Sequence, residues 1–245
     1  MGRIQVGRAV VVFVLAAIAA ACSGGSPKAT GSSPAPTITT SSSAPAPSDK
    51  SRAQAIVLTD ADFPAGWQGS AHTEDAADKA FERRGEACAG VKPGATTADV
   101  FGDDFTSGQA SVGSETQFFK SAAIARADIE SVNNTKLFSC VRTVLIDELK
   151  AALAKQGAQG ATLSSVSLAK IGVPKYADQS AGIRLTATVT VAGQAVRLFQ
   201  EVIVARKGRA EATASFFDIG AAFPASLERS LFSTISARLV ADGGV

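Results

Sequence analysis

The sequence predicts an α+β domain in which an antiparallel sheet ends in a three-stranded meander and is packed by a long helical segment and a C-terminal amphipathic helix. Apolar and polar residues alternate over residues 184–191, and two further strand-like runs follow after glycine-containing turns. Apolar residues then recur at helical spacing over residues 227–239. A run of strands followed by helices on one side of the sheet is typical of α+β proteins.

The chain begins with an export signal, residues 1–21. Two arginines precede an apolar run over residues 10–21, which is too short to cross about 30 Å of hydrocarbon. The run ends on Ala19-Ala20-Ala21-Cys22, which resembles the lipobox of bacterial lipoproteins, whose cysteine thiol is diacylated. This resemblance implies that Cys22 becomes the acylated (palmitate-bearing) N-terminus and attaches the protein to the cell membrane, facing outside the cytoplasm. An ordinary secretory signal is the alternative.

A tether and one folded domain follow the signal. Residues 22–52 are mostly Ser, Pro, Thr, Ala and Gly, so they bury too little surface to offset the entropy of ordering and are predicted to be disordered. Residues 53–242 hold enough large apolar residues for a single extracytoplasmic domain. Both surplus positive charges, Arg3 and Arg8, lie in the signal, so the composition predicts no nucleic-acid partner.

The domain contains two cysteines, Cys88 and Cys140. An isolated pair in an exported protein is expected to form a disulfide, and two buried free thiols are the alternative. Residues 75–88 predict a short helix or an irregular turn that ends near Cys88. Cys140 lies beside the apolar stripe of a predicted long helix, so its sulfur is expected to face the body of the protein.

The middle of the domain predicts one strand and two helices. Residues 109–118 alternate like a strand, and Ser121 is a suitable N-cap for a helix over residues 122–132. The pair Asn133-Asn134 breaks this helix, and a second helix is predicted over residues 135–155.

The C-terminal third predicts strands over residues 184–191, 196–206 and 209–217, and a helix that begins after Pro224. One face of this meander is predicted to be a core surface formed by Leu185, Ala187, Val189, Val196, Leu198, Val202, Val204, Ala212 and Phe216. The opposite face is mixed in character and is predicted to carry Thr186, Thr188, Arg197, Phe199, Ile203, Thr213 and Phe217.

The mixed face is the candidate ligand site, and its predicted contacts are Thr188, Arg197, Phe199, Ile203 and Phe217. An arginine for an anionic head group beside apolar side chains suits a lipid or another amphiphilic small molecule. The alternative is that the helices of residues 121–156 cover this face and turn it into a second core.

No arrangement of residues in the sequence predicts catalysis. The single histidine, His72, lies in a polar segment and is interpreted as a surface loop residue. No nucleophile elbow, phosphate-binding glycine loop or metal-ligand spacing is present. The expectation is therefore a protein without catalytic residues, bound metal or cofactor.

Several short signals together resemble a known group of proteins. The chain combines the Cys22 lipobox, the tether and an Asp-Phe-Pro-Ala-Gly-Trp motif within residues 60–67. One cysteine follows just after the first predicted helix and a second lies on the long helix. A strand-strand-strand-helix unit comes next, with Val-Ile-Val-Ala-Arg-Lys-Gly at residues 202–208 in its middle strand. This layout resembles actinobacterial lipoproteins related to the extracellular sensor domain of mycobacterial PknH-type serine/threonine kinases. It is also similar to the PsbP-like fold of LpqN-type lipoproteins. That sensor domain has two disulfides, whereas this domain has the cysteines for one.

The resemblance implies envelope sensing or ligand binding, with no defined reaction. The expected function is therefore that of a lipid-anchored extracytoplasmic sensor-like or ligand-binding domain of the cell envelope. An accessory lipoprotein that binds another envelope protein is the alternative.

Overall fold

An eight-stranded antiparallel sheet runs through the centre of the computed structural model, which describes residues 47–74, 76–90, 92–155 and 161–242. The strand order is β1-β3-β4-β8-β7-β6-β5, and β2 also pairs with β4. The strands are β1 (Gln68–Ser70), β2 (Thr96–Phe101), β3 (Asp104–Ser107), β4 (Ala110–Phe119), β5 (Thr162–Ile171), β6 (Gln179–Val191), β7 (Gln194–Lys207) and β8 (Ala210–Ile219). The predicted α+β class is confirmed.

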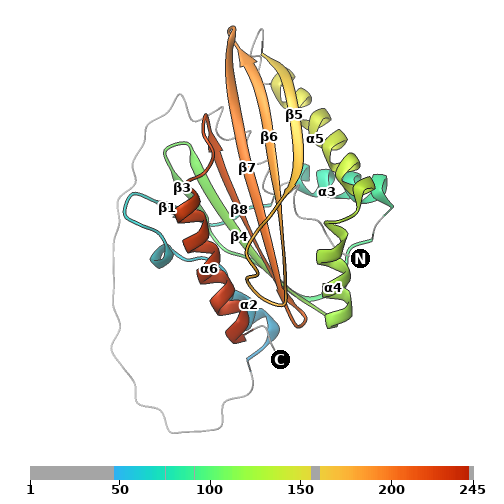
Figure 1. Ribbon diagram of the computed structural model, residues 1–245, viewed down its shortest axis with the longest axis vertical. Coiled ribbons are helices and arrows are strands. Elements are labelled where there is room, and N and C mark those ends of the chain that lie inside the picture. The colour runs from blue at the N-terminus through green and yellow to red at the C-terminus, as the bar shows by residue number, and fades with distance from the viewer. Residues whose placement is uncertain (1–46, 75, 91, 156–160, 243–245) are drawn as a thin grey trace.

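Helices lie on both faces of this sheet. They are α2 (Asp49–Ile56), α3 (Ala76–Ala89), α4 (Ala122–Ser131), α5 (Thr135–Lys155) and α6 (Ala225–Asp242), with a 3₁₀ turn over Asp60–Asp62. Helices α2 and α6 pack on one face, and α3, α4 and α5 pack on the other (Figure 1). The expectation of helices on one side is wrong, because both faces of the sheet carry apolar side chains.

The predicted meander is present as β6, β7 and β8. The β6–β7 ladder runs from Gln179↔Arg206 to Val191↔Gln194. Its two-residue turn places Ala192 and Gly193 at φ angles of 49° and 80°, as the favoured tight hairpin turns require. The second hairpin pairs Lys207 with Ala210 and extends to Leu198↔Ile219. The first two predicted strands therefore lie within longer observed strands, and the third overlaps β8, which begins one residue later than predicted.

The register assigns the faces of these strands differently from the sequence prediction. Residues that pair across a ladder share a face. Leu185 pairs with Gln200, and Gln200 pairs with Phe217, so Phe217 lies on the face of Leu185. Phe216 and Ala212 lie on the opposite face, in the core under α6. The predicted faces are therefore correct for β6 and much of β7, and wrong for β8.

A disulfide joins α3 to α5, as predicted. The Cα atoms of Cys88 and Cys140 are 5.6 Å apart, within the range that a disulfide requires. Cys140 is buried in the core that α5 forms with the sheet. The covalent bond therefore holds α3 against α5.

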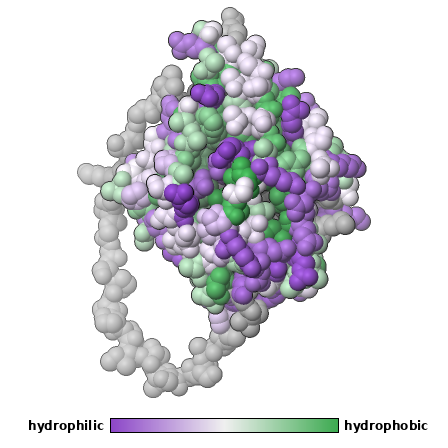
Figure 2. All heavy atoms as spheres, in the orientation of Figure 1, coloured by the Kyte–Doolittle hydropathy of each residue, from purple (hydrophilic) through white to green (hydrophobic). Residues whose placement is uncertain are grey.

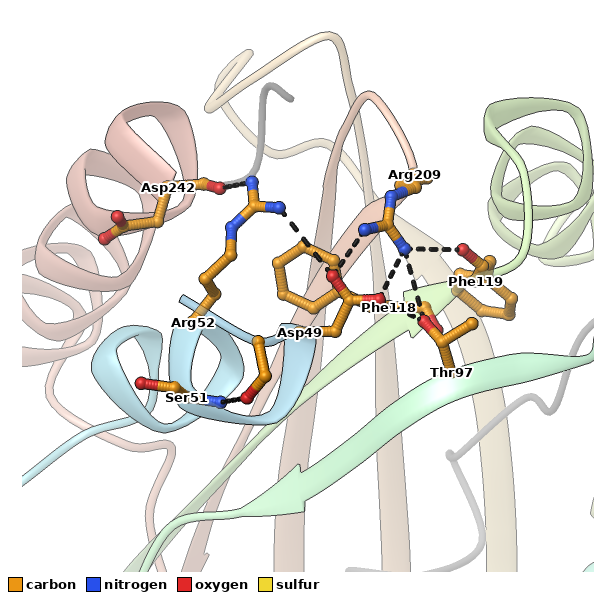
Figure 3. A network of polar contacts seen from close by, with 9 residues as sticks. Asp49, Ser51, Arg52, Thr97, Phe118, Phe119, Arg209 and Asp242 are labelled. Carbon is orange, nitrogen blue, oxygen red and sulfur yellow. Dashed lines mark hydrogen bonds and ion pairs between the residues drawn. The ribbon is translucent and has the colours of Figure 1, made fainter. Parts of the chain in front are cut away.

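Helix α2 is joined to the body of the domain by a polar network (Figure 3). Asp49 accepts hydrogen bonds from Nη1 of Arg209 at 2.7 Å and from Oγ1 of Thr97 at 2.5 Å. The hydrogen bond from Arg209, opposed by partial burial, gives Asp49 a pKa below its usual value. The ordered helix begins at Asp49, earlier than the boundary expected at residue 53.

An aromatic ring completes this network. The ring of Phe118 lies between the guanidinium groups of Arg52 and Arg209, whose central carbons are 4.8 and 5.2 Å from its centroid. Arg52 also donates a hydrogen bond to the backbone carbonyl of Asp242 at the end of α6. The first and last helices of the described structure therefore meet at this ring.

The predicted signal, the acylated Cys22 and most of the predicted tether lie outside the described residues. Across the ranges that are described, no helix combines the length and apolar character needed to span a membrane.

Candidate functional site

Polar side chains replace apolar ones over part of the sheet face that carries α4. We call this set the polar layer, and each member is less than one tenth exposed. Its members are Ser111, Glu115 and Gln117 on β4, Glu211 and Ser215 on β8, Gln200 and Arg206 on β7, and Asp128 on α4. Buried side chains of these types are uncommon and require a specific reason.

Strand register places the polar layer on adjacent strands. At one end, Ser111 pairs with Phe217, which pairs with Gln200. At the other end, Gln117 pairs with Glu211, which pairs with Arg206. The layer therefore extends over β4, β8 and β7 in the middle of the sheet, with apolar core residues such as Phe217 among its members.

Hydrogen bonds orient the amides of the layer. Nε2 of Gln117 donates to Asp99 Oδ2 at 3.1 Å and to Glu115 Oε1 at 2.9 Å. Nε2 of Gln200 donates to Ser215 Oγ at 2.7 Å. Both amide nitrogens are thus engaged, and each amide oxygen is held in a defined direction.

The charged end of the layer contains Asp128, Arg206 and Glu211. Burial raises the pKa of Glu211 well above its usual value, the nearby Asp128 raises it further, and Arg206 acts in the opposite direction. Arg206 also donates from Nε to Gln179 Oε1 at 2.6 Å. This end of the layer therefore binds a proton more readily than isolated carboxylates do.

Among the buried oxygens of the layer, Ser111 Oγ, Gln200 Oε1 and Glu211 Oε2 have no hydrogen-bond partner within the described part of the chain. A buried polar atom without a partner typically costs about 1–3 kcal/mol. Gln200 is 1% exposed, so this cost is not relieved by bulk solvent. The layer therefore contains hydrogen-bonding capacity that the described fold does not use.

A cleft of about 300 Å³ lies beside the charged end of the layer. It lies between the end of α4 and the start of β6, and Glu130, Lys175, Asp178 and Gln179 are among the residues that line it. Gln179 also accepts the hydrogen bond from Arg206, so the cleft and the polar layer adjoin. None of the five ligand contacts predicted from the sequence lines this cleft.

Three of those predicted contacts lie together on the sheet face toward α6. Thr188 pairs with Arg197, and Phe199 is two residues further along β7 on the same face. The guanidinium carbon of Arg197 is 5.8 Å from the ring centroid of Phe199. Arg197 is exposed, and Thr188 and Phe199 are half-buried. Their role in ligand binding stays a prediction.

The other two predicted contacts are not part of that surface. Ile203 lies on the same face but is 1% exposed, in the core beneath α6. Phe217 lies on the opposite face and is 2% exposed. The prediction that all five residues share one accessible face is therefore wrong, because the β7–β8 register reverses the expected orientation of Phe217.

A pair of carboxyl groups lies next to the accessible part of this face. Glu201 on β7 accepts a hydrogen bond from Arg184 Nε at 2.6 Å. Glu228, in the first turn of α6, has its pKa raised to about 7, first by burial and then by the charge and hydrogen bond of Glu201. Glu228 therefore keeps its proton up to about neutral pH, beside the carboxyl group of Glu201.

This pair predicts a pH dependence of stability. The pKa of Glu228 is about 7 in the folded protein, against a usual value of 4.5. Between pH 4.5 and 7 the folded state therefore keeps this proton, whereas the unfolded state loses it. The free energy of unfolding consequently falls as pH rises through this window. Glu228→Gln supplies a permanent neutral donor. We expect it to raise the free energy of unfolding at pH 8 by about 1–2 kcal/mol, with little change at pH 4.5.

Thermal unfolding between pH 4.5 and 8 measures this effect. Asp103→Asn is a matched control, since it removes an exposed carboxylate from the loop between β2 and β3. Parallel pH profiles for the wild type and Glu228→Gln would show that the carboxyl pair does not contribute.

His72 contributes contacts within the fold. Its Nδ1 lies 3.0 Å from Asp104 Oδ2, and its ring stacks on Phe101 with centroids 4.5 Å apart. The interpretation of His72 as a simple surface loop residue is therefore incomplete. Among the described residues, no group of three or more His, Cys, Asp or Glu side chains is arranged to hold a metal ion.

Comparisons with known proteins give limited information. No family model matches the chain, and no curated protein matches it. The crystal structure of the extracellular domain of PknH from Mycobacterium tuberculosis is similar over 80% of this chain and 96% of that chain, with 13% sequence identity and a TM-score of 0.38. This degree of similarity is too low to assign a family or a function.

Proposed function

We propose that this chain is a lipid-anchored protein of the cell envelope whose domain is sensor-like, faces outside the cytoplasm and binds a small polar ligand through the polar layer. The export signal and the lipobox at Cys22 support the anchor and the location. The unpaired buried oxygens of the polar layer carry the proposal of ligand binding. The proposal includes no catalytic reaction.

The energetic argument concerns the middle of the sheet. Apolar residues in place of Gln200 and Ser215 would remove a buried hydrogen bond together with an unpaired oxygen, a change that is usually neutral or stabilising. A sequence that keeps polar groups here gives up stability, which is typical of binding sites. A ligand that donates a hydrogen bond to Gln200 Oε1 would satisfy this oxygen.

An amphiphilic ligand has less support than a polar one. Its apolar body was assigned to Phe199, Ile203 and Phe217, and the structure leaves only Phe199 accessible on that face. Binding of another envelope protein is the second outcome that an experiment must distinguish.

Native mass spectrometry of the protein purified from its own envelope tests the proposal. We expect the wild type to retain a small molecule. The double variant Gln200→Leu/Ser215→Ala should lose most of this molecule, while its melting temperature is unchanged or higher, because a buried unpaired oxygen has been removed.

Ser226→Ala/Ser230→Ala is the matched control, because it removes two hydroxyls from exposed positions of α6, on the other face of the sheet. A folded wild type without an adduct, an adduct that persists in the Gln200→Leu/Ser215→Ala variant, or a bound protein in place of a small molecule would each contradict the proposal.

A further inference from the structure

A second surface of the domain has the chemistry of a binding site and is independent of the polar layer. We call it the open face, and it lies on the α6 side of the sheet, where the upper ends of β5, β6 and β7 in Figure 1 extend past α6. Its members are Ser165 and Ser167 on β5, Thr186 and Thr188 on β6, Arg197 and Phe199 on β7, and Asp218 on β8.

Register arranges these side chains in two rows across the sheet. Ser167 pairs with Thr186, Thr186 with Phe199, and Phe199 with Asp218. Because neighbouring strands are about 4.8 Å apart, this row is about 14 Å long. Ser165, Thr188 and Arg197 form the adjacent row. The open face is therefore wide enough to contact several units of a polymer.

The charges of the open face and its border balance. Arg184 and Arg197 supply donors, whereas Glu201 and Asp218 supply acceptors, and the four hydroxyls can do both. Figure 2 shows mostly pale side chains of intermediate hydropathy in the upper part of the view, where the open face lies. Such alternation of donors and acceptors without surplus charge complements a neutral molecule rich in hydroxyl groups.

The apolar content of the open face is small and aromatic. Phe199 is half-buried, and the guanidinium carbon of Arg197 lies over its ring at 5.8 Å from the centroid. Among the described residues, the large apolar side chains classed as exposed are Val191 and Val240. Stable protein interfaces and lipid-binding surfaces need a larger apolar patch than this. A single ring among hydrogen-bonding groups suits a sugar, whose ring has an apolar face and a hydroxyl-bearing edge.

We propose that the open face binds a neutral polysaccharide, with one sugar ring against Phe199 and the neighbouring hydroxyls bonded to Thr188, Arg197 and Asp218. This surface is separate from the polar layer, which lies on the opposite face of the sheet.

Affinity electrophoresis of the full-length protein in detergent tests this inference. The gels contain dextran, laminarin or arabinogalactan as neutral polysaccharides, or dextran sulfate as a polyanion. We expect at least one neutral polysaccharide to slow the wild type and dextran sulfate to have a weaker effect. Phe199→Ala should raise the apparent dissociation constant at least tenfold.

Phe138→Ala is the matched control. Phe138 is also a half-buried phenylalanine, and the Lys170 ammonium nitrogen lies over its ring at 5.5 Å from the centroid. It differs from Phe199 in lying on α5, on the other side of the sheet. We expect this variant to bind like the wild type. If Phe199→Ala does not fold, Asp218→Asn and Arg197→Gln replace it, and each should weaken binding severalfold.

Three results would overturn the inference: no retardation of the wild type by any of the neutral polysaccharides, equal retardation of the wild type and a folded Phe199→Ala variant, or stronger retardation by dextran sulfate. None of these results would bear on the small molecule expected at the polar layer.

Discussion

Replacing both Cys88 and Cys140 by serine should lower the free energy of unfolding by about 4 kcal/mol. The two cysteines are 52 residues apart in the chain, and a crosslink that closes a loop of this length removes roughly that much conformational freedom from the unfolded chain. The main packing partner of α3 is α5, so the reduced protein also loses the covalent link that holds α3 in place.

Urea unfolding of the oxidised wild type and the double variant measures this change, with the slope of the transition checked for a two-state process. Ser139→Ala, which changes the exposed residue next to Cys140, is the control and should leave the midpoint unchanged. An unchanged midpoint in the double serine variant would contradict a stabilising disulfide.

Replacing Cys22 by serine should release the protein from the membrane or leave its precursor uncleaved. The proposed anchor depends on this thiol, which would carry the diacyl group. Stable attachment needs two acyl chains, because one chain gives only marginal membrane binding.

Membrane fractionation and the mass of the mature N-terminus measure the outcome. Ser23→Ala is the control, because it changes the next residue and leaves the thiol in place. If Cys22→Ser is cleaved and fractionates like the wild type, the signal is an ordinary secretory one and the proposed anchor is wrong.

Local patterns in the sequence predict the C-terminal half of the fold well. Period-two alternation and glycine turns define β6, β7 and β8, and the break at Asn133-Asn134 separates α4 from α5. Short strands such as β1 and β3 give no comparable signal, since three or four residues are too few for a period to emerge. Strand β5 was also missed, because four Ser and Thr residues interrupt its apolar positions.

The candidate sites depend on strand register, which the sequence did not reveal. The hairpin between β7 and β8 sets whether Phe216 or Phe217 faces Leu185, and a shift of one residue exchanges the two faces. The polar layer has a signal in the sequence, since Ser111, Glu115 and Gln117 occupy alternate positions of one strand. Its partners Glu211 and Ser215 become neighbours only when β4 pairs with β8.

The network around Asp49 has a mechanical consequence. A force that reaches Asp49 along the chain from its N-terminal side passes directly to Arg209, beside the β7–β8 turn. Arg52 connects the same point to the last residue of α6. Figure 1 places α2 at the end of the sheet away from the β6–β7 turn. If the N-terminus is anchored as proposed, tension on the chain is therefore borne by one end of the domain, and the strand ends that form the open face carry little of the load.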